Sequence, residues 1–507
     1  MKAQRQSTRL SFVLQLIFRV LTSLFALLWT PLLLGAMGRA LNGTYLNLQS
    51  LGSLGGLGDL GLGGSLSIRT GREIGQGRVH QLGQFLAVAR GFFLVLTSLA
   101  FVVTLALAPH LFAVAKYNQV PGVGSLQVLG WVLALAVVLV MLNSYASSLS
   151  YGCGNVLWPI IPGFLLLQGT LLTQIFLARH HFPLWIISLP GPVTGLVTLA
   201  LSFYYVRISH PALGALLPVK LDLGQIGGFL GQSLWVYLYS AAAGVYLLTD
   251  QFMVSHHFGP GMVPLYVYNR KLCELAAFAI NSACLVSLPK ITQWFASPEA
   301  SDQERARHET ERLSSFQIIL GCAAALVYLT MNDSFVHLWL GRDFQAPFGL
   351  EMAFAAVLVT TAAGQAGFDM GGRCCEHGIR VGGIIVMAAA LVNFGLAWLA
   401  MRQGWLWGIA LATAVVQVFV MLAMGRFTAR NMKLSWWRLT VRNWLLGLAT
   451  LGLGAWEHEF LTSADGLKIA IVLGVDVVAL VCIVRLVNVG MADLRRELSL
   501  FKGMIGR

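Results

Sequence analysis

Charged side chains inside long apolar runs are the residues of this sequence that could do chemistry. Arg19 lies eight residues into the run 11–34, and Arg90 lies at a similar depth in the run 82–108. Arginine stays charged at physiological pH and binds phosphate oxygens through two parallel hydrogen bonds. Because a charge in hydrocarbon is costly, both arginines are predicted to face a water-filled cavity and to bind an anionic group there.

The alternative for both arginines is structural. Asp59, in the run 44–68, could pair with Arg19 or Arg90 and hold neighbouring helices together. A shallow arginine can also extend its charged end to the membrane surface. The sequence leaves these alternatives open.

A second group of charges stands in “YNRKLCE”. Arg270 and Lys271 precede Glu274 by four and three residues, which predicts a local ion pair on one helix face. One cation is left over as a candidate for substrate binding, and Asp250 is a candidate partner for it. Asp476, in the run 467–487, has no evident partner in the sequence. It is interpreted either as a proton-coupling site or as a residue facing a water-filled crevice.

Composition indicates what must position these residues. The 507-residue chain is 57% hydrophobic and 11% charged, with a mean hydropathy of +0.73. Soluble domains carry about 25% charged residues, so this chain cannot cover a water-facing surface. Apolar runs long enough to cross hydrocarbon recur from end to end and predict an all-α membrane protein. The fourteen predicted spans are 11–34, 44–68, 82–108, 124–148, 156–178, 184–206, 226–254, 263–289, 313–334, 348–368, 381–400, 404–425, 436–456 and 467–487.

The loops predict the orientation. An even number of spans places both termini on one side, and most of the 34 Lys and Arg residues then fall on inner loops and tails. This is the positive-inside pattern, so the net charge of +13 reflects topology and requires no nucleic-acid partner. The first run is too long for a signal peptide. The seven cysteines fall in spans or inner loops, which argues against disulfides.

The predicted organisation is two parallel six-span lobes, residues 1–206 and 226–430, joined by an interfacial linker, residues 207–225. Residues 431–507 hold the last two spans and a cytoplasmic tail. The inner loop 289–315 is polar and mixed in charge, which predicts a helical extension beneath the bilayer.

Two stretches match motifs of soluble enzymes, but each lacks residues that the motif requires. “GLGDLG” (residues 56–61) matches a dinucleotide-binding fingerprint, but it lies in an apolar run and lacks an acid about 20 residues on. Small residues at that spacing favour close helix packing in a membrane. “RCCEH” lacks a second pair of zinc ligands. No catalytic residue, metal site or cofactor is predicted, and without an ATP-binding motif the chain is not predicted to drive transport with ATP by itself.

The early stretch “PLLLGAMGRALNGTYLNLQSLGSLGGLGDLGLGGSLSI” resembles bacterial polysaccharide flippases of the O-antigen and exopolysaccharide type. These belong to the multidrug/oligosaccharidyl-lipid/polysaccharide exporter superfamily. The motif residues are Arg39, Gly43 and Tyr45, followed by an Asp-Leu-Gly-Leu that contains Gly61. “LLTDQFMVSHHFGPGMVPLYVYNRKLCELAAFAINSACLVSLPKIT” and “LVNFGLAWLAMRQGWLWGIALATA” are also similar to the family, although Pro264 is an addition to its usual turn.

The resemblance implies a V-shaped bundle of two lobes around a central cavity. The substrate would be an oligosaccharide on polyprenyl pyrophosphate, flipped from the inner to the outer leaflet of the cytoplasmic membrane by alternating access. The two final spans would flank a groove for the lipid tail. Implied partners are membrane lipid, the glycan substrate, a polysaccharide polymerase and other assembly proteins, and no enzymatic activity is expected.

Three alternatives remain. A cation-coupled multidrug antiporter of the same superfamily would require a carboxylate in the first lobe, and Asp59 keeps it open. A membrane-embedded polysaccharide polymerase or ligase is disfavoured because the outer loops are short. A lipid II flippase would differ only in its substrate.

Overall fold

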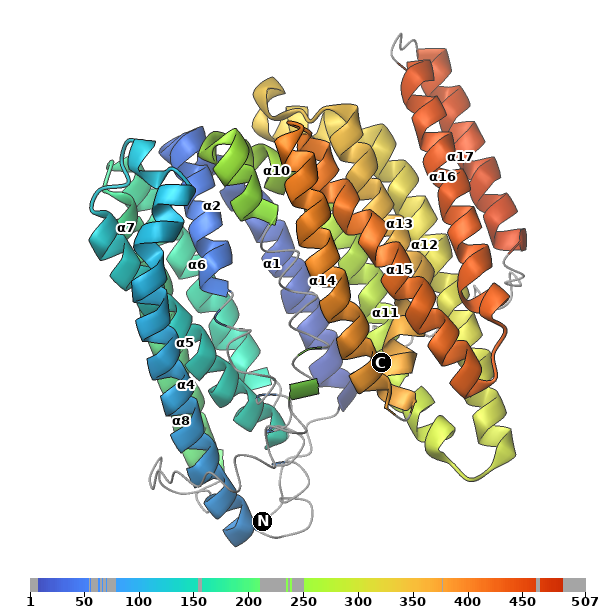
Figure 1. The fold of residues 1–507 in the computed structure, drawn as a ribbon, viewed down its shortest axis with the longest axis horizontal. Helices are drawn as coiled ribbons and strands as arrows, with labels where there is room; N and C mark the ends of the chain where they lie inside the picture. The colour runs from blue at the N-terminus through green and yellow to red at the C-terminus, as the bar shows by residue number, and fades with distance from the viewer. Residues whose placement is uncertain are drawn as a thin grey trace. The chain divides into compact units, whose positions relative to one another are not determined.

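The computed structural model describes residues 8–53, 79–153, 157–209, 250–375, 377–461 and 466–486, with a few isolated positions between them. The regular structure in this part of the chain is helical, without strands (Figure 1). Eight helices in it are long and apolar enough to cross a membrane: Phe85–Val114, Leu126–Tyr151, Ile161–Arg179, Leu184–Ile208, Ala300–Leu340, Phe348–Gly372, Gly378–Arg402 and Leu406–Met432. The predicted all-α, multi-pass fold is confirmed. The count of fourteen spans stays a prediction, since most of the second and seventh lie outside the described residues.

Contacts between Cα atoms divide the chain into two compact units, Met1–Pro264 and Leu265–Arg507. Residues 250–264 belong by their contacts to the first unit. The predicted lobe boundaries, 206 and 226, stay a prediction because residues 210–233 lie outside the described part.

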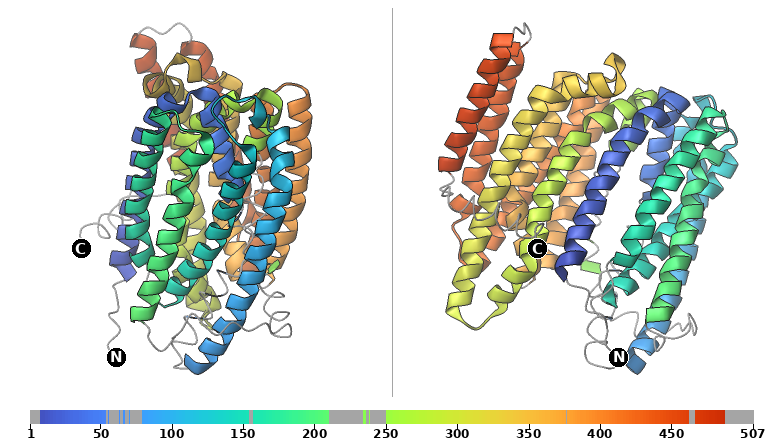
Figure 2. Two further views of the ribbon diagram at one scale, coloured as in Figure 1. Left: turned by 90° about the vertical axis from the view of Figure 1, so that its left-hand side faces the viewer. Right: turned by 180° about the vertical axis from the view of Figure 1, so that it is seen from behind.

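Unit 1 is a bundle of long helices. Within it α4 packs on α5, α5 on α8, and α1 on α6 (Figure 2, left). Its helices are α1 (Thr8–Met37), α2 (Arg39–Ser53), α4 (Val79–Val114), α5 (Leu126–Gly152), α6 (Leu157–Arg179), α7 (Leu184–Ser188) and α8 (Pro190–Ser209). Unit 1 also contains two short 3-10 turns, η2 (Tyr117–Gln119) between α4 and α5, and η4 (Pro260–Met262). A core of aromatic and aliphatic side chains, including Phe112, Tyr117 and Leu129, fills the space between α2, α4 and α5.

Unit 2 is arranged around α13 (Phe348–Cys374), which contacts α11 (Lys271–Ala296), α12 (Ala300–Leu340) and α15 (Leu406–Met432). Its other helices are α10 (Val263–Asn269), α14 (Gly378–Arg402), α16 (Arg442–Leu461) and α17 (Gly466–Leu486), with short turns at η5 (Arg342–Phe344) and η6 (Trp437–Val441). A Cβ placed on Gly364 of α13 would lie 2.3 Å from the Met421 Cβ of α15. The two helices therefore approach more closely than larger residues would allow, which is a common way for membrane helices to pack.

Two predicted spans each contain a one-residue irregularity, at Leu189 and at Arg270, where the backbone keeps right-handed helical dihedral angles. The sixth is divided into α7 and α8, and Pro190 begins the second piece, where its missing N–H has no helical partner to lose. The eighth is divided by a turn at Arg270 between α10 and α11. Apolar runs predict where a helix crosses the membrane but do not reveal such an irregularity.

The inner loop 289–315 is largely helical, as predicted, and its place beneath the bilayer stays a prediction. Helix α11 continues to Ala296, and the 41-residue α12 begins at Ala300. Ion pairs three residues apart support the start of α12, such as Arg307 with Glu304 at 3.0 Å.

The last two described helices, α16 and α17, pair with each other at one edge of unit 2 (Figure 2, right). Helix α16 also packs on α12 and α13. The five-residue π-helix Trp437–Val441 precedes it.

Candidate functional site

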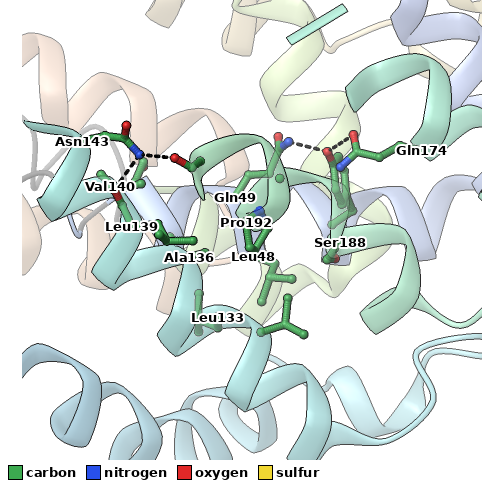
Figure 3. A pocket seen from close by; sticks show the side chains of 16 residues that line it. Leu48, Gln49, Leu133, Ala136, Leu139, Val140, Asn143, Gln174, Ser188 and Pro192 are labelled. Atoms are coloured by element: carbon green, nitrogen blue, oxygen red, sulfur yellow. Dashed lines mark hydrogen bonds between the residues drawn. The ribbon is translucent and has the colours of Figure 1, made fainter. Parts of the chain in front are cut away.

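A cavity with a volume of about 370 Å³ lies among the described residues of unit 1 (Figure 3). This is within the range of about 300–1,000 Å³ that is usual for ligand sites. Four parts of the fold supply its wall: α2, the middle of α5, Gln174 of α6, and the α7–α8 junction from Ser188 to Gly195. The cavity thus occupies the space around the irregularity in the sixth predicted span.

One side of the cavity carries a chain of hydrogen bonds. Tyr45 donates from its hydroxyl to Gln174 Oε1 at 2.7 Å, and Gln49 Nε2 donates to the Tyr45 hydroxyl oxygen (Figure 3). Tyr45 and Gln49 lie one turn apart on α2, so both side chains reach the same wall. The chain orients Tyr45 and leaves amide groups at the cavity surface.

Asn143 lies at the other side of the cavity (Figure 3). Its Nδ2 donates to the carbonyls of Leu139 and Gly195, each at 2.9 Å, and so ties α5 to α8. Its buried Oδ1 has no partner in the described part of the chain, and neither has the buried Oγ of Ser188. Buried polar atoms are nearly always paired, so two open ones in one cavity wall indicate a place for a polar ligand or water.

The rest of the wall is apolar and uncharged. None of the sixteen described lining residues is Asp, Glu, Lys, Arg or His. The apolar surface comes from Leu48, Val132, Leu133, Ala136, Leu139 and Val140. This cavity can therefore accept neutral polar groups beside apolar ones, but its described lining offers no ion pair.

The sequence motif around Gly43 positions α2, which carries much of this wall. A Cβ on Gly43 would lie 1.8 Å from the Pro260 carbonyl oxygen and 2.9 Å from Pro264 Cδ. Arg39 fixes the same contact, because its Nε donates to the Gly261 carbonyl at 2.7 Å. The added Pro264 therefore packs against the motif glycine. Only Gly38 separates α1 from α2 at this end.

The first predicted cations are only partly described. Arg19 belongs to α1, but its side chain lies outside the described residues, as do Asp59 and Gly61. Arg90 on α4 is half-buried, and its Nε donates to the Leu86 carbonyl at 3.0 Å. Whether these arginines face a cavity stays a prediction.

The second cationic group forms the predicted local pair. Arg270 Nε and Lys271 Nζ each lie 2.8 Å from a different oxygen of Glu274. The three side chains together carry one net positive charge, as the sequence predicts. Arg270 occupies the N-cap position of α11, where its side chain makes no capping hydrogen bond.

The remaining predicted acids are buried to different degrees. Asp250 is 2% exposed at the start of the helical residues 250–258, and its neighbour Gln251 accepts a hydrogen bond from Ser50 of α2 at 2.6 Å. Asp476 is half-buried on α17, which packs on α16, and Glu457 of α16 is fully buried. Glu457 is a second buried acid in these two helices that the sequence did not single out.

Sequence reasoning also missed the cavity amides and a buried acid of unit 2, Glu351. Glu351 is 2% exposed, and its Oε1 accepts from Asn332 Nδ2 at 2.6 Å. The sequence did contain a sign of it, because Glu351 is an acid in the first turn of the predicted span 348–368. Gln174 and Asn143 are neutral, and a neutral side chain in an apolar run gives little sign of function before the helices are placed.

Comparison with known proteins supports the architecture. No protein-family model and no curated protein matches the chain. Among solved structures it is similar to the lipid II flippase MurJ in an inward closed conformation, with a TM-score of 0.65 and 12% identity, over 93% of this chain and 98% of MurJ. It is also similar to an inward-facing multidrug resistance MATE family transporter of the MOP superfamily, with a TM-score of 0.61 and 14% identity, over 81% of this chain and 94% of that one. A MOP superfamily transporter from Pyrococcus furiosus gives a TM-score of 0.53 at 13% identity, over 84% and 94% of the two chains.

The chain has the fold of these transporters. At 12–14% identity the likeness concerns the fold alone.

Proposed function

We propose that this chain is a transporter that flips a polyprenyl-pyrophosphate-linked oligosaccharide from the inner to the outer leaflet of the bacterial cytoplasmic membrane, for cell-surface polysaccharide synthesis. The observation that carries the proposal is the likeness to MurJ over 93% of this chain and 98% of that one. The motif around Arg39, Gly43 and Tyr45 supports it, because these residues hold α2 against η4 and place Tyr45 in the cavity wall.

The substrate has three chemically different parts, and each requires its own surface. A pyrophosphate requires cations, for which Arg19, Arg90, Arg270 and Lys271 are the candidates. A glycan requires neutral donors and acceptors, which the unit 1 cavity offers. A prenyl tail requires an apolar surface. Helices α16 and α17 are the candidates for it, because Leu448, Val477, Val478 and Val481 are exposed on them.

In this function no covalent bond is made or broken, and the protein acts by alternating access. Asp59, Asp250, Glu274 and Asp476 are the candidates for coupling to ions or for structural ion pairs. Both termini lie in the cytoplasm in this proposal, and a polysaccharide polymerase and other assembly proteins act with the chain. The alternative of a polymerase or ligase gains no support, since the similar structures named above are transporters.

Reconstitution tests the proposal directly. Proteoliposomes that contain a polyprenyl-pyrophosphate disaccharide should expose it in the outer leaflet faster than protein-free vesicles, as measured by a membrane-impermeant glycosidase. Cells that lack the protein should accumulate the lipid-linked glycan on the inner leaflet and lose surface polysaccharide. The proposal would be contradicted if cells without the protein kept normal surface glycan and if proteoliposomes flipped the lipid no faster than protein-free vesicles.

A cation-coupled multidrug antiporter is the second candidate, favoured by the MATE transporter at a TM-score of 0.61. It predicts that loss of the protein sensitises cells to cationic dyes while surface glycan stays normal. The same two measurements therefore separate the candidates.

A further inference from the structure

The described wall of the unit 1 cavity offers no cation to hold a pyrophosphate. None of its sixteen residues is charged, and a phosphate group removed from water requires charged partners or several donors aimed at it. The group of the substrate that enters this cavity is therefore uncharged.

The polar atoms of the wall fit hydroxyl and amide groups. Tyr45, Gln49 and Gln174 form a hydrogen-bonded row on one side, and Asn143 lies on the other (Figure 3). Two wall atoms, Asn143 Oδ1 and Ser188 Oγ, are buried without a partner in the described chain. One can only accept and the other can both donate and accept, which matches a sugar hydroxyl or an acetamido group.

The apolar part of the wall completes the match. A sugar ring has C–H faces and a polar edge, so it prefers a cavity with both kinds of surface. Leu48, Leu133 and Ala136 offer the apolar face, and Gly191 adds no side chain on the α8 side, where a Cβ would meet nothing within 4 Å. A prenyl tail would cover Asn143 Oδ1 and Ser188 Oγ without pairing either of them.

We infer that this cavity is a binding site for an uncharged carbohydrate group of the substrate, and that the pyrophosphate is bound by cations outside its described wall. The inference rests on the proposed function, since it names which part of the lipid-linked glycan enters unit 1. A volume of about 370 Å³ is near the lower end of the range for ligand sites, so the cavity holds a short part of a glycan.

The test compares two lipids that differ only in the sugar. The probes are polyprenyl pyrophosphate carrying a disaccharide of N-acetylhexosamine and the same lipid without sugar. Their affinities for the purified full-length protein in nanodiscs are measured for the wild type and for S188A and N143L. Ser188 Oγ makes no hydrogen bond in the described chain, so S188A should fold normally. N143L gives up two hydrogen bonds, and its thermal midpoint is checked first.

Matched controls change the same residue types away from the cavity. Ser150 is buried on α5 and bonds back to the Ala146 carbonyl, so S150A removes a hydroxyl without touching the cavity. Asn118 is exposed in η2, and N118L is the control for N143L.

The wild type should bind the glycosylated lipid about tenfold or more tightly than the bare lipid. S188A and folded N143L should each reduce this preference by about three- to tenfold, the effect of one hydrogen bond, without changing the affinity for the bare lipid. The controls should keep the wild-type preference. An unchanged preference in S188A, or an equal loss for both lipids, overturns the inference.

The outcomes also separate the inference from the proposed function. A wild type that flips both lipids but binds them equally well retains the function and refutes the carbohydrate site. A wild type that binds and flips neither lipid refutes the proposed function itself.

Discussion

Asn332 Nδ2 lies 2.6 Å from Glu351 Oε1 inside unit 2, and both side chains are almost completely buried. Asn332 Nδ2 also lies 3.1 Å from Asn269 Oδ1, and Asn269 Nδ2 donates to the Phe344 carbonyl at 2.8 Å. These amides join α10, α12 and α13 around one carboxyl group. In the described part of the chain, no Lys or Arg forms an ion pair with Glu351.

The first prediction concerns this pair. N332L leaves the buried Glu351 without its amide donor, which should lower the free energy of unfolding of unit 2 by about 1–3 kcal/mol. The double variant N332L/E351M removes both polar groups and should recover much of the loss. Thermal midpoints measure the effect, and N431L, at an exposed asparagine of α15, is the control. A double variant less stable than N332L would contradict the interpretation.

The second prediction concerns the contact of α2 with η4. G43A places a Cβ 1.8 Å from the Pro260 carbonyl oxygen, which cannot move without the backbone of η4. We expect a loss of about 1–3 kcal/mol and a displaced α2. The control is G52A in the same helix, where the nearest atoms lie 3.9 Å away. There the change should be neutral or should stabilise the helix by up to about 1 kcal/mol. Equal midpoints for the two variants would refute the close contact.

The third prediction concerns the packing of α13 on α15. G364L forces a side chain into the space held by Met421, so α13 and α15 must separate, at a cost of about 1–3 kcal/mol or more. G395L adds the same atoms on the exposed side of α14, where nothing lies within 4 Å. We expect a lower thermal midpoint and lower abundance for the first variant only. A midpoint for G364L that matches the G395L value would show that α13 and α15 pack less closely than described.

Part of the fold could be predicted from the sequence because hydrocarbon imposes it. Apolar runs such as 381–400 must form helices to satisfy their backbone, and α14 does cover that run. The mixed charges after Pro289 likewise indicated the long extension of α12. The irregularities at Leu189 and Arg270 could not be predicted in the same way, because the apolar residues on both sides of each are numerous enough for one continuous span.

The site was less predictable for a related reason. Charges are conspicuous in an apolar sequence, so the local pairing of Arg270, Lys271 and Glu274 could be predicted. The sequence left one of the two cations over, whereas both lie 2.8 Å from Glu274. The cavity is made by neutral residues from five helices, and Asn143 and Gln174 line one cavity only when α5 and α6 are placed. Tyr45 is the one cavity residue that the sequence also pointed to, because it belongs to the sequence motif and its hydroxyl forms part of the cavity wall.

The last prediction concerns Arg19, whose helix α1 is held in unit 1 partly by the hydrogen bond from Trp29 to Gln168 of α6, 2.8 Å long. If Arg19 binds the pyrophosphate, R19A should abolish flipping of the lipid-linked disaccharide while protein abundance stays normal. R19K keeps the charge but loses the planar fork, and should retain part of the activity. R207A, at an exposed arginine near the end of α8, should behave as the wild type.

An ion pair between Arg19 and Asp59 predicts a different outcome for the same variants. Removal of one partner would strand a buried charge at a cost of about 3–5 kcal/mol, so R19A would reduce abundance, and the double variant R19A/D59A would restore it. Flipping by the double variant then decides between the two roles. Restored abundance with restored flipping would refute the pyrophosphate role, because the proposed ligand is still missing. Normal abundance of R19A with no flipping in either variant would support that role, and together with a sugar preference lost in S188A it would assign pyrophosphate and glycan to different parts of unit 1.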